Sequence, residues 1–524
     1  MKRSLLFVMV ITLCFSFPSK LFSQKVEKGE RQITNELLKE YIDFLASDSL
    51  LGRRAPGNGK ELDVAADYIA AQFEKFKLGK INGSYFQTVP FYSQNLDTKN
   101  SFLKISDNNT SKEYQLKTDF IPFEMTLSGS VKAEIVFAGY GITAPEYNYD
   151  DYSGLDVKGK IVLVLKHEPG ENDTTSVFDG KKETKYSSLA TKLENAKKHG
   201  ASGFLLVNDP LNHMMLKPQG YPWPSLSKLL PQDNLPIQLD ARDGSEIPIA
   251  QVGENVIKQL FGSVDSLKKI QISIDKTLKP NSFQLAGFNC DLSTKLIFKE
   301  YTSKNVVGLI KGTDEKTGEE LVVIGGHYDH VGYNKEHKDG EDYIYNGADD
   351  NASGTAGVMA IAKAFTSMKQ KPSRSVLFIL FTAEEMGLYG SAYYSSHPLL
   401  PLDKTVAMLN LDMIGRNGDD TLNIEGASIN PDLTALILKE NEKVGLKYVP
   451  SGEEMFGRSD HYNFFVKGIS GVDITSGLHK DYHTVRDNPN TINHTKVTRI
   501  SRLIFRTTWS IANDNKYFTI LKNK

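Results

Sequence analysis

The 524-residue sequence predicts an α/β protein whose mostly parallel, mixed sheet is flanked by helices, with a β-rich domain inserted into it. Two observations predict this class. After Lys304, short apolar runs typical of strands alternate with helical patterns. Between residues 121 and 278, short apolar runs are separated by turn-rich loops and one helical pattern. The length agrees with more than one domain, because single cores seldom grow beyond about 250–300 residues.

Residues 1–23 have the layout of a secretory signal peptide. Two basic residues precede an apolar stretch from Leu5 to Phe17, and small and polar residues follow around Ser23. The apolar stretch is shorter than the roughly 20 residues that a membrane-spanning helix needs. We therefore expect export to a periplasm or out of the cell. Cleavage near Ser23 leaves Cys290 as the one cysteine, which excludes an internal disulfide.

The composition argues against two classes of partner. Lys and Arg number 62 and Asp and Glu 64, and the body of the chain has no long basic run, so we expect no nucleic-acid partner. No later segment is long and apolar enough for a membrane span. A hydrophobic fraction of 40% is sufficient for sizeable cores.

The N-terminal half predicts helices followed by buried strands. Residues 35–76 favour two amphipathic helices around a Gly/Pro/Arg-rich loop at 52–59. Further on, the runs "AEIVFAGYG", "KIVLVLKH" and "SGFLLVND" are typical of buried strands, and "SLATKLENAKKHGA" of a helix. We expect one domain formed by residues 24–120 and 279–524, with residues 121–278 as the insertion.

The C-terminal half predicts an alternating sheet. The strands "NVVGLIKG" and "LVVIGGH" are followed by a helix at 353–368 and the strands "SVLFILFT" and "VAMLNLDM". A helix at 431–444, the strand "GISGVDIT" and a last helix from about Asn493 complete the pattern. Ligands of such sheets bind beyond the carboxyl ends of the strands.

Potential metal ligands recur where these strands end. His327, Glu384-Glu385 and Asp412 each follow an apolar run, Asp349-Asp350 precedes a helix, and Tyr482-His483 lies in a loop. Adjacent like charges such as the two glutamates cost stability unless a cation lies near them. Imidazole and carboxylate together suit zinc, and two zinc ions about 3.5–4 Å apart need a bridging carboxylate. The pattern therefore predicts a metal site.

The ordered motifs are similar to those of metallopeptidase family 28. They are His-x-Asp, Gly-Ala-Asp-Asp-Asn-x-Ser-Gly, Glu-Glu-x-Gly-x-x-Gly-Ser, Asn-x-Asp-Met-x-Gly and Tyr-His-Thr, and they lie within residues 300–515. The family includes bacterial dizinc aminopeptidases, glutamate carboxypeptidase and glutaminyl cyclases. The inserted "DDYSGLDVKGKIVLVLKH" and "AKKHGASGFLLVND" resemble a protease-associated domain. The resemblance implies the zinc exopeptidase fold with an inserted protease-associated domain.

The resemblance also implies a set of ligands for two zinc ions. His327 and Asp412 would bind one ion, Glu385 and His483 the other, and Asp350 would bridge both. The neighbouring His330 and Asp349 are alternative ligands.

Four further residues receive roles by the same resemblance. Glu384 would be the general base, Asp329 would orient His327 through its other ring nitrogen, and Tyr482 would donate to the oxyanion of the tetrahedral intermediate. Arg458 would lie near the substrate pocket. In the alternative, Tyr482 only packs against its loop and Arg458 forms a structural ion pair. The histidines interpreted as supporting, surface or packing residues are His461, His199, His213, His397 and His494.

Together with the signal-peptide pattern, the resemblance implies an exported zinc exopeptidase, an aminopeptidase that hydrolyses N-terminal residues from peptides through a metal-activated water. A glutamate-carboxypeptidase-like enzyme is one alternative, but it needs a cluster of arginines and the sequence shows only scattered ones. A single-zinc glutaminyl cyclase is a second, and the full two-metal ligand set argues against it. A metal-free, receptor-like binding protein is the third alternative. It predicts that some of the metal ligands are missing, and none of the five is missing from this sequence.

Overall fold

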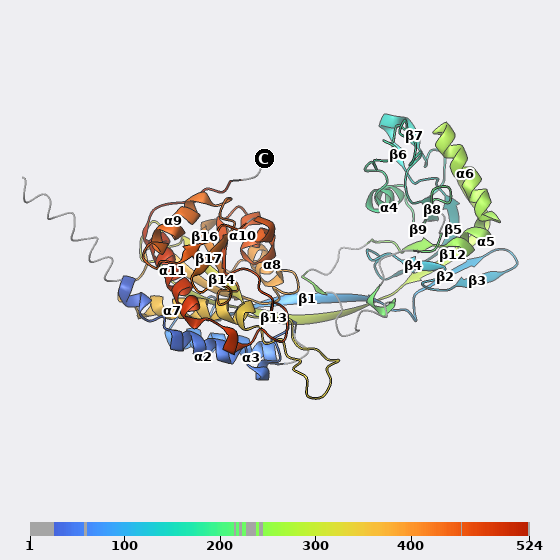
Figure 1. Cartoon of the computed structure of the whole chain (residues 1–524). Coiled ribbons are helices and arrows are strands. Elements are labelled where there is room, and N and C mark those ends of the chain that lie inside the picture. The colour runs from blue at the N-terminus through green and yellow to red at the C-terminus, as the bar shows by residue number, and fades with distance from the viewer. Residues whose placement is uncertain are drawn as a thin grey trace, which may run out of the picture. The chain divides into compact units, whose positions relative to one another are not determined.

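The computed structural model describes residues 26–56, 60–213, 216–218, 223–226, 237–239, 245–451 and 453–521. The chain forms two compact units (Figure 1). The first contains the residues up to Phe91 and those from Tyr301 onward, and the second is Tyr92–Glu300. The signal peptide expected at residues 1–23 lies outside the described residues.

The first unit is built on a mixed sheet with a parallel centre. The strand order of the sheet is β10-β1-β13-β15-β14-β16-β19-β17-β18, in which β10 (Ile237–Gln238) and the outer parts of β1 and β13 belong to the second unit. Strand β14 pairs in parallel with β15 and β16, and β16 pairs in parallel with β19. Strand β13 pairs antiparallel with β15, and β17 pairs antiparallel with β19 and parallel with β18. The strands are β1 (Phe86–Leu96), β13 (Leu296–Ile310), β14 (Leu321–His327), β15 (Ser375–Phe381), β16 (Thr405–Leu411), β17 (Thr421–Glu425), β18 (Lys447–Tyr448) and β19 (Gly471–Thr475).

Helices cover both faces of this sheet because its central strands are apolar on both sides. All seven residues of β15 are buried. Phe378 on one face packs against Phe365, which also contacts Phe505 and Trp509. The opposite face packs against α8 and α10 in a core that includes Leu377, Ile379, Tyr394 and Phe464. The predicted mixed α/β class, with a sheet flanked by helices, is confirmed.

Helices α2 and α11 begin close to where the sequence predicts them, whereas the sequence analysis does not predict α8 or α10. Thr34 caps α2 by accepting a hydrogen bond from the Leu37 N–H, and Asn493 caps α11 by accepting one from the Lys496 N–H. Helices α7 and α11 pack side by side (Figure 1). The helices of this unit are α2 (Asn35–Leu45), α3 (Glu61–Phe76), α7 (Gly354–Ser367), α8 (Tyr389–Ser396), α9 (Pro431–Asn441), α10 (His461–Val466) and α11 (His494–Asn513).

The second unit has its own sheet and core. Its strand order is β3-β2-β12-β5-β8-β9-β11-β4, and β5, β8, β9 and β11 pair in parallel. Alternate residues of β8 pack into two separate hydrophobic cores on opposite faces of the sheet. Leu163 belongs to one core and Val164 to the other. The strands are β2 (Phe102–Ser106), β3 (Ser111–Tyr114), β4 (Phe120–Pro122), β5 (Gly129–Phe137), β8 (Ile161–Leu165), β9 (Gly203–Val207), β11 (Ile249–Val252) and β12 (Phe283–Thr294), and the helices are α4 (Leu189–Lys198), α5 (Glu254–Phe261) and α6 (Val264–Thr277).

The second unit, Tyr92–Glu300, extends beyond both ends of the segment 121–278 expected from the sequence. Strand β12 pairs antiparallel with both β2 and β5, so the chain on either side of the expected segment belongs to the same sheet. Among the described residues, none of the helices has the length and apolar character that crossing a lipid bilayer requires.

The start of α7 leaves no room for a side chain at Gly354. A Cβ atom there would lie 2.2 Å from the main-chain oxygen of Leu411 and 2.3 Å from Oδ1 of Asn351. We expect Gly354→Ala to lower the free energy of unfolding by about 1–3 kcal/mol, the usual cost of overpacking. Thermal unfolding of the full chain measures this. Gly457→Ala is the control, because a Cβ there would meet only the Tyr462 ring, at 3.9 Å or beyond, and equal unfolding temperatures would contradict the prediction.

Candidate metal centre

The parallel register of three strands brings the predicted ligands to one edge of the sheet. His327 is the last residue of β14 and pairs with Phe381, the last residue of β15. Glu384 and Glu385 follow β15 by three and four residues. Asp412 directly follows β16, the other parallel neighbour of β14. The loop after β19 supplies His483, and the turn before α7 supplies Asp350.

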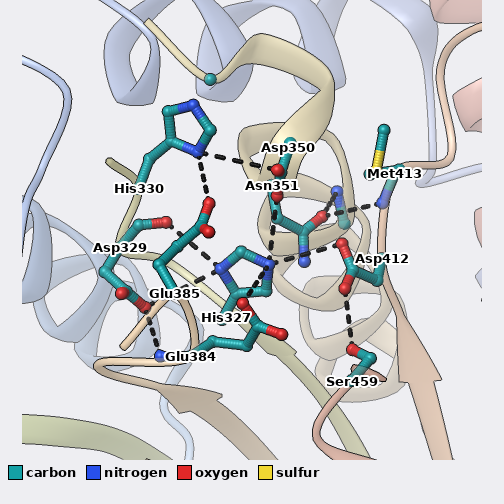
Figure 2. Close-up of polar contacts among 12 residues, drawn as sticks. His327, Asp329, His330, Asp350, Asn351, Glu384, Glu385, Asp412, Met413 and Ser459 are labelled. Atoms are coloured by element: carbon teal, nitrogen blue, oxygen red, sulfur yellow. Dashed lines mark hydrogen bonds and ion pairs between the residues drawn. The ribbon is translucent and has the colours of Figure 1, made fainter. Parts of the chain in front are cut away.

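Two groups of potential metal ligands lie at this edge. In the first, His327 Nε2 is 3.3 Å from Asp350 Oδ1, 3.4 Å from Asp412 Oδ1 and 3.7 Å from Glu384 Oε2. Figure 2 shows these side chains pointing toward one another. The ligand atoms of His327, Glu384 and Asp412 all lie within 4.8 Å of one another.

The second group shares Asp350 with the first. His483 Nε2 is 3.1 Å from Asp350 Oδ2 and 3.0 Å from Glu385 Oε2. Asp350 therefore directs one carboxylate oxygen toward each histidine. His330, one of the alternative ligands, also belongs here, because its Nδ1 is 2.7 Å from Glu385 Oε1 and 3.8 Å from Asp350 Oδ2.

The residues present fit a pair of divalent ions. Among the described residues, His327 Nε2, His483 Nε2 and Asp412 Oδ1 are buried without a hydrogen-bond partner. A buried polar atom without a partner is costly, and metal coordination removes that cost. Imidazole nitrogens and carboxylate oxygens are the ligands that zinc accepts, and one carboxylate lies between the two groups as a bridge requires.

Asp349 and His461 lie outside both groups. Asp349 Oδ1 accepts hydrogen bonds from the Ser353 hydroxyl at 3.0 Å and the Gly415 N–H at 2.6 Å, and Oδ2 is 3.3 Å from His479. This carboxylate is therefore occupied in holding the loops together. Burial lowers the pKa of His461 to about 3, so this ring is neutral at physiological pH.

Asp329 contacts His327 in a different way from the one predicted. His327 Nδ1 lies 3.2 Å from the main-chain oxygen of Asp329, and the Asp329 carboxylate is farther away, at 3.8 Å. That carboxylate accepts a hydrogen bond from the Glu384 N–H at 3.1 Å. Burial raises the pKa of Asp329 to about 7. Asp329 thus connects the His327 ring with the turn that carries Glu384 (Figure 2).

The two adjacent glutamates have opposite environments. Burial raises the pKa of Glu384, and repulsion from Asp412 and Glu385 raises it further against the attraction of His327. Burial and the charge of Asp350 also raise the pKa of Glu385, but the imidazoles of His330 and His483 beside it hold that pKa below the ordinary value. The two adjacent glutamates therefore differ in how readily each takes up a proton.

Arg53 supports the site from a loop to which the sequence assigned no function. The side chain is 1% exposed. Its guanidinium donates to the main-chain oxygens of Tyr328 at 2.9 Å, Asn346 at 2.6 Å and Gly347 at 3.0 Å, and to that of Leu45. Arg53 thus joins the loop after β14 to the loop that leads into Asp350. A buried arginine cannot be recognised from a Gly/Pro/Arg-rich run, because that composition equally indicates a solvated loop.

Two more positioning residues escaped the sequence analysis. The Asp487 carboxylate accepts hydrogen bonds from the N–H groups of Asp349 at 3.0 Å and Asp350 at 3.1 Å. The Ser459 hydroxyl donates to Asp412 Oδ2 at 2.7 Å and accepts from the Asn410 side chain at 2.8 Å. Asp487 follows the Tyr-His-Thr motif by three residues, and Ser459 directly follows Arg458.

A pocket adjoins the two groups and contains the remaining predicted residues. Asp350, Glu384, Asp412, Tyr482 and Arg458 line it. The Tyr482 ring stacks on His483 with centroids 3.8 Å apart, and its hydroxyl accepts a hydrogen bond from Arg458 at 3.4 Å.

The pocket wall also contains an acidic pair. Glu425 on β17 and Asp473 on β19 are direct partners across the two strands, and both line the pocket. Like charges opposite each other on a sheet are destabilising. Burial raises the pKa of both groups. A cation in this pocket would relieve the repulsion.

The hydrogen bond from Ser459 to Asp412 yields a test of the first group. Ser459→Ala leaves Asp412 Oδ2 without its donor, and loss of such a supporting hydrogen bond typically weakens metal binding by about 10–100-fold. Competition with a chelator measures the zinc affinity. Ser396→Ala is the control, since Ser396 is exposed at the end of α8. Equal affinities in the two variants would refute the positioning role of Ser459.

Comparisons with known proteins agree with the two-unit organisation. The sequence model of peptidase family M28 matches residues 305–508, and that of the PA domain matches residues 131–260. Leucine aminopeptidase 2 of Trichophyton equinum is 28% identical over 244 residues, which cover 44% of this chain and 46% of that protein. Aminopeptidase YwaD of Bacillus subtilis is 25% identical over 398 residues, covering 73% of this chain and 70% of that protein.

The chain spans about half the length of the fungal relatives that it matches. A solved structure that is similar is BSAP, a zinc aminopeptidase from Bacillus subtilis, with 19% identity, a TM-score of 0.46, and coverage of 92% of this chain and 96% of that chain. The two groups of potential metal ligands in the first unit lie within residues 305–508, the region that the peptidase family M28 model matches. The chain is therefore similar to peptidase family M28 over residues 305–508 and to the PA domain over residues 131–260.

Proposed function

We propose that the protein is an exported, zinc-dependent aminopeptidase that removes N-terminal residues from peptides. The observation that supports it most directly is the pair of histidine-carboxylate groups that share Asp350, with Glu384 beside them in a pocket. The names of the relatives agree with this chemistry. Export rests on the signal-peptide pattern of residues 1–23, and we propose the compact unit Tyr92–Glu300 as the extent of the insertion.

Five residues would hold two zinc ions. His327 and Asp412 would bind one ion, Glu385 and His483 the other, and Asp350 would bridge them through its two oxygens. The short contact between His330 Nδ1 and Glu385 Oε1 suits a positioning hydrogen bond, because it leaves Glu385 Oε2 directed toward His483. When bound, the ions supply Lewis-acid polarisation of the scissile carbonyl and lower the pKa of the attacking water.

The protein groups around this centre would transfer the proton of the attacking water and stabilise the negative charge that develops on the carbonyl oxygen. Glu384 would take the proton of the attacking water and pass it to the leaving amine. Asp329 would keep Glu384 in place through the hydrogen bond to its main-chain N–H. The Tyr482 hydroxyl lies near the cationic Arg458 and would donate to the oxyanion as the carbonyl becomes tetrahedral.

The acidic character of the pocket favours an amino-terminal over a carboxy-terminal substrate end. Of the side chains lining the pocket, Asp350, Glu384, Asp412, Glu425 and Asp473 are acidic, and Arg458 is cationic. In this proposal zinc offsets the charges of Asp350 and Asp412, and Glu384 acts on the water. Glu425 and Asp473 are left to attract an α-ammonium and to repel a substrate carboxylate. This argues against the glutamate-carboxypeptidase-like alternative.

Replacing each glutamate of the pair separately tests the central assignment. Glu384→Gln should retain both zinc ions and a folded site while turnover falls by about 10²–10⁴, because an amide cannot accept the proton of the water. Glu385→Gln should weaken one zinc site, and added zinc should restore part of the activity. Metal analysis and peptide hydrolysis on the same samples distinguish the two. If Glu384→Gln loses zinc and Glu385→Gln keeps it, the two roles are reversed.

Neutralising the acidic pair tests the choice of substrate end. We expect Asp473→Asn combined with Glu425→Gln to raise KM for free-amine aminoacyl reporters by about 10-fold or more, since a hydrogen bond to a charged group contributes about 1.5–3 kcal/mol. N-acetylated reporters should be poor substrates of the parent protein. Glu454→Gln is the matched control, because Glu454 is exposed on the neighbouring turn. Unchanged KM in the double variant, or faster hydrolysis of N-blocked peptides, would overturn this assignment.

A further inference from the structure

The second unit repeats, at the ends of two of its own strands, the pattern that marks the metal centre of the first. Strands β8 and β9 are parallel neighbours. His167 and Glu171 follow the end of β8, and Asp209 and His213 follow the end of β9, each pair four residues apart. Because the carboxyl ends of adjacent parallel strands lie together, the four side chains converge.

Their ligand atoms lie within reach of a single ion. His213 Nε2 is 3.1 Å from both oxygens of Glu171 and 4.0 Å from Asp209 Oδ2. His167 Nδ1 is 3.8 Å from Glu171 Oε2 and is hydrogen-bonded to Asp209 Oδ2. One ligand atom from each residue lies within 4.8 Å of the others, as in the two groups of the first unit. Two imidazoles and two carboxylates make a four-ligand set that suits tetrahedral zinc.

The charges around the group favour a divalent cation. Asp209 is fully buried, and the side chain of Glu171 is 20% exposed. The two imidazole rings stack with centroids 4.3 Å apart, so two imidazolium charges there would repel each other. The ammonium of Lys192 is buried nearby and donates to the main-chain oxygens of Tyr140 and His167. The Lys192 charge also faces Asp151 and Glu168, so it is shared between Asp209 and carboxylates outside the group.

Neighbouring groups hold the ligands in place. The Lys166 N–H donates to Asp209 Oδ1 at 2.9 Å, which leaves Oδ2 directed at His167. The Asn212 side chain donates to Glu171 Oε2 at 3.0 Å. Such hydrogen bonds to ligating carboxylates are typical of metal sites. His213 was interpreted from the sequence as a surface or packing residue, because it lies outside the motifs of the first unit.

We propose that His167, Glu171, Asp209 and His213 form a separate binding site for a divalent transition metal of the zinc class. The ion would tie the loop after β8 to the loop after β9 and so stabilise the edge of the second sheet. This site is independent of the proposed peptidase function, because it uses none of the residues of the first unit.

The experiment measures metal content in a full-length chain from which the two histidine ligands of the first unit are removed. A His327→Ala/His483→Ala variant is loaded with zinc, or with cobalt as a spectroscopic probe, and desalted. We expect it to retain one ion per chain and to show the visible absorption of four-coordinate cobalt. Adding His167→Ala and His213→Ala should abolish both signals. Adding His199→Ala instead should leave both unchanged, since His199 stacks on Tyr152 away from the group.

Glu171→Gln provides a second test that preserves the shape of the site. In the same background it should weaken cobalt binding by at least about 10-fold without changing the circular dichroism spectrum. Zinc should also raise the thermal unfolding temperature of the background variant and have no such effect once His167 and His213 are replaced. A background variant that retains no metal, or metal retention that survives the loss of both histidines, would overturn the proposal.

Discussion

The parallel pairing of β14 with β15 and β16 is the constraint on which the rest of the site depends. Because the three strands run in the same direction and in register, His327, the Glu384-Glu385 turn and Asp412 emerge at the same edge. Both faces of these strands are apolar and buried by helices, and the polar ligands begin only where the strands end. A slip of one residue would exchange the two faces and bury a ligand in the core.

Gathering so many carboxylates at one buried edge has a cost that the surrounding groups offset. Burial raises the pKa of Asp329 and Asp460 to about 7. Arg53 contributes a fixed positive charge from beneath the loops, and burial lowers its own pKa only to about 10, so it remains charged. The imidazoles and Arg53 reduce the repulsion without removing it. The remaining negative charge is what makes the edge suitable for divalent cations.

The sequence identifies the strands and the candidate ligands for one physical reason, and it misses supporting residues for another. His327 and Asp412 are recognisable because each adjoins an apolar run whose period identifies the strand. Arg53 donates to the main-chain oxygen of Asn346, 293 positions away, and Asp487 accepts from the main-chain N–H of Asp350, 137 positions away. No local sequence pattern records such contacts. Asp329 shows a finer limit: sequence identifies the residue, but only coordinates show that its main-chain oxygen, not its carboxylate, faces His327.

The second unit shows how the same rule can be overlooked in the absence of a known motif. The strands β8 and β9 were predicted as buried strands, and the polar residues after them are the same types as those after β14 and β16. These polar residues can form one site only if the two strands are parallel neighbours. The sequence does not reveal this pairing, whereas the structure shows it. Strand adjacency therefore distinguishes a convergent ligand set from scattered surface histidines. It is long-range information, and in both units it is what turns loop residues into a candidate metal site.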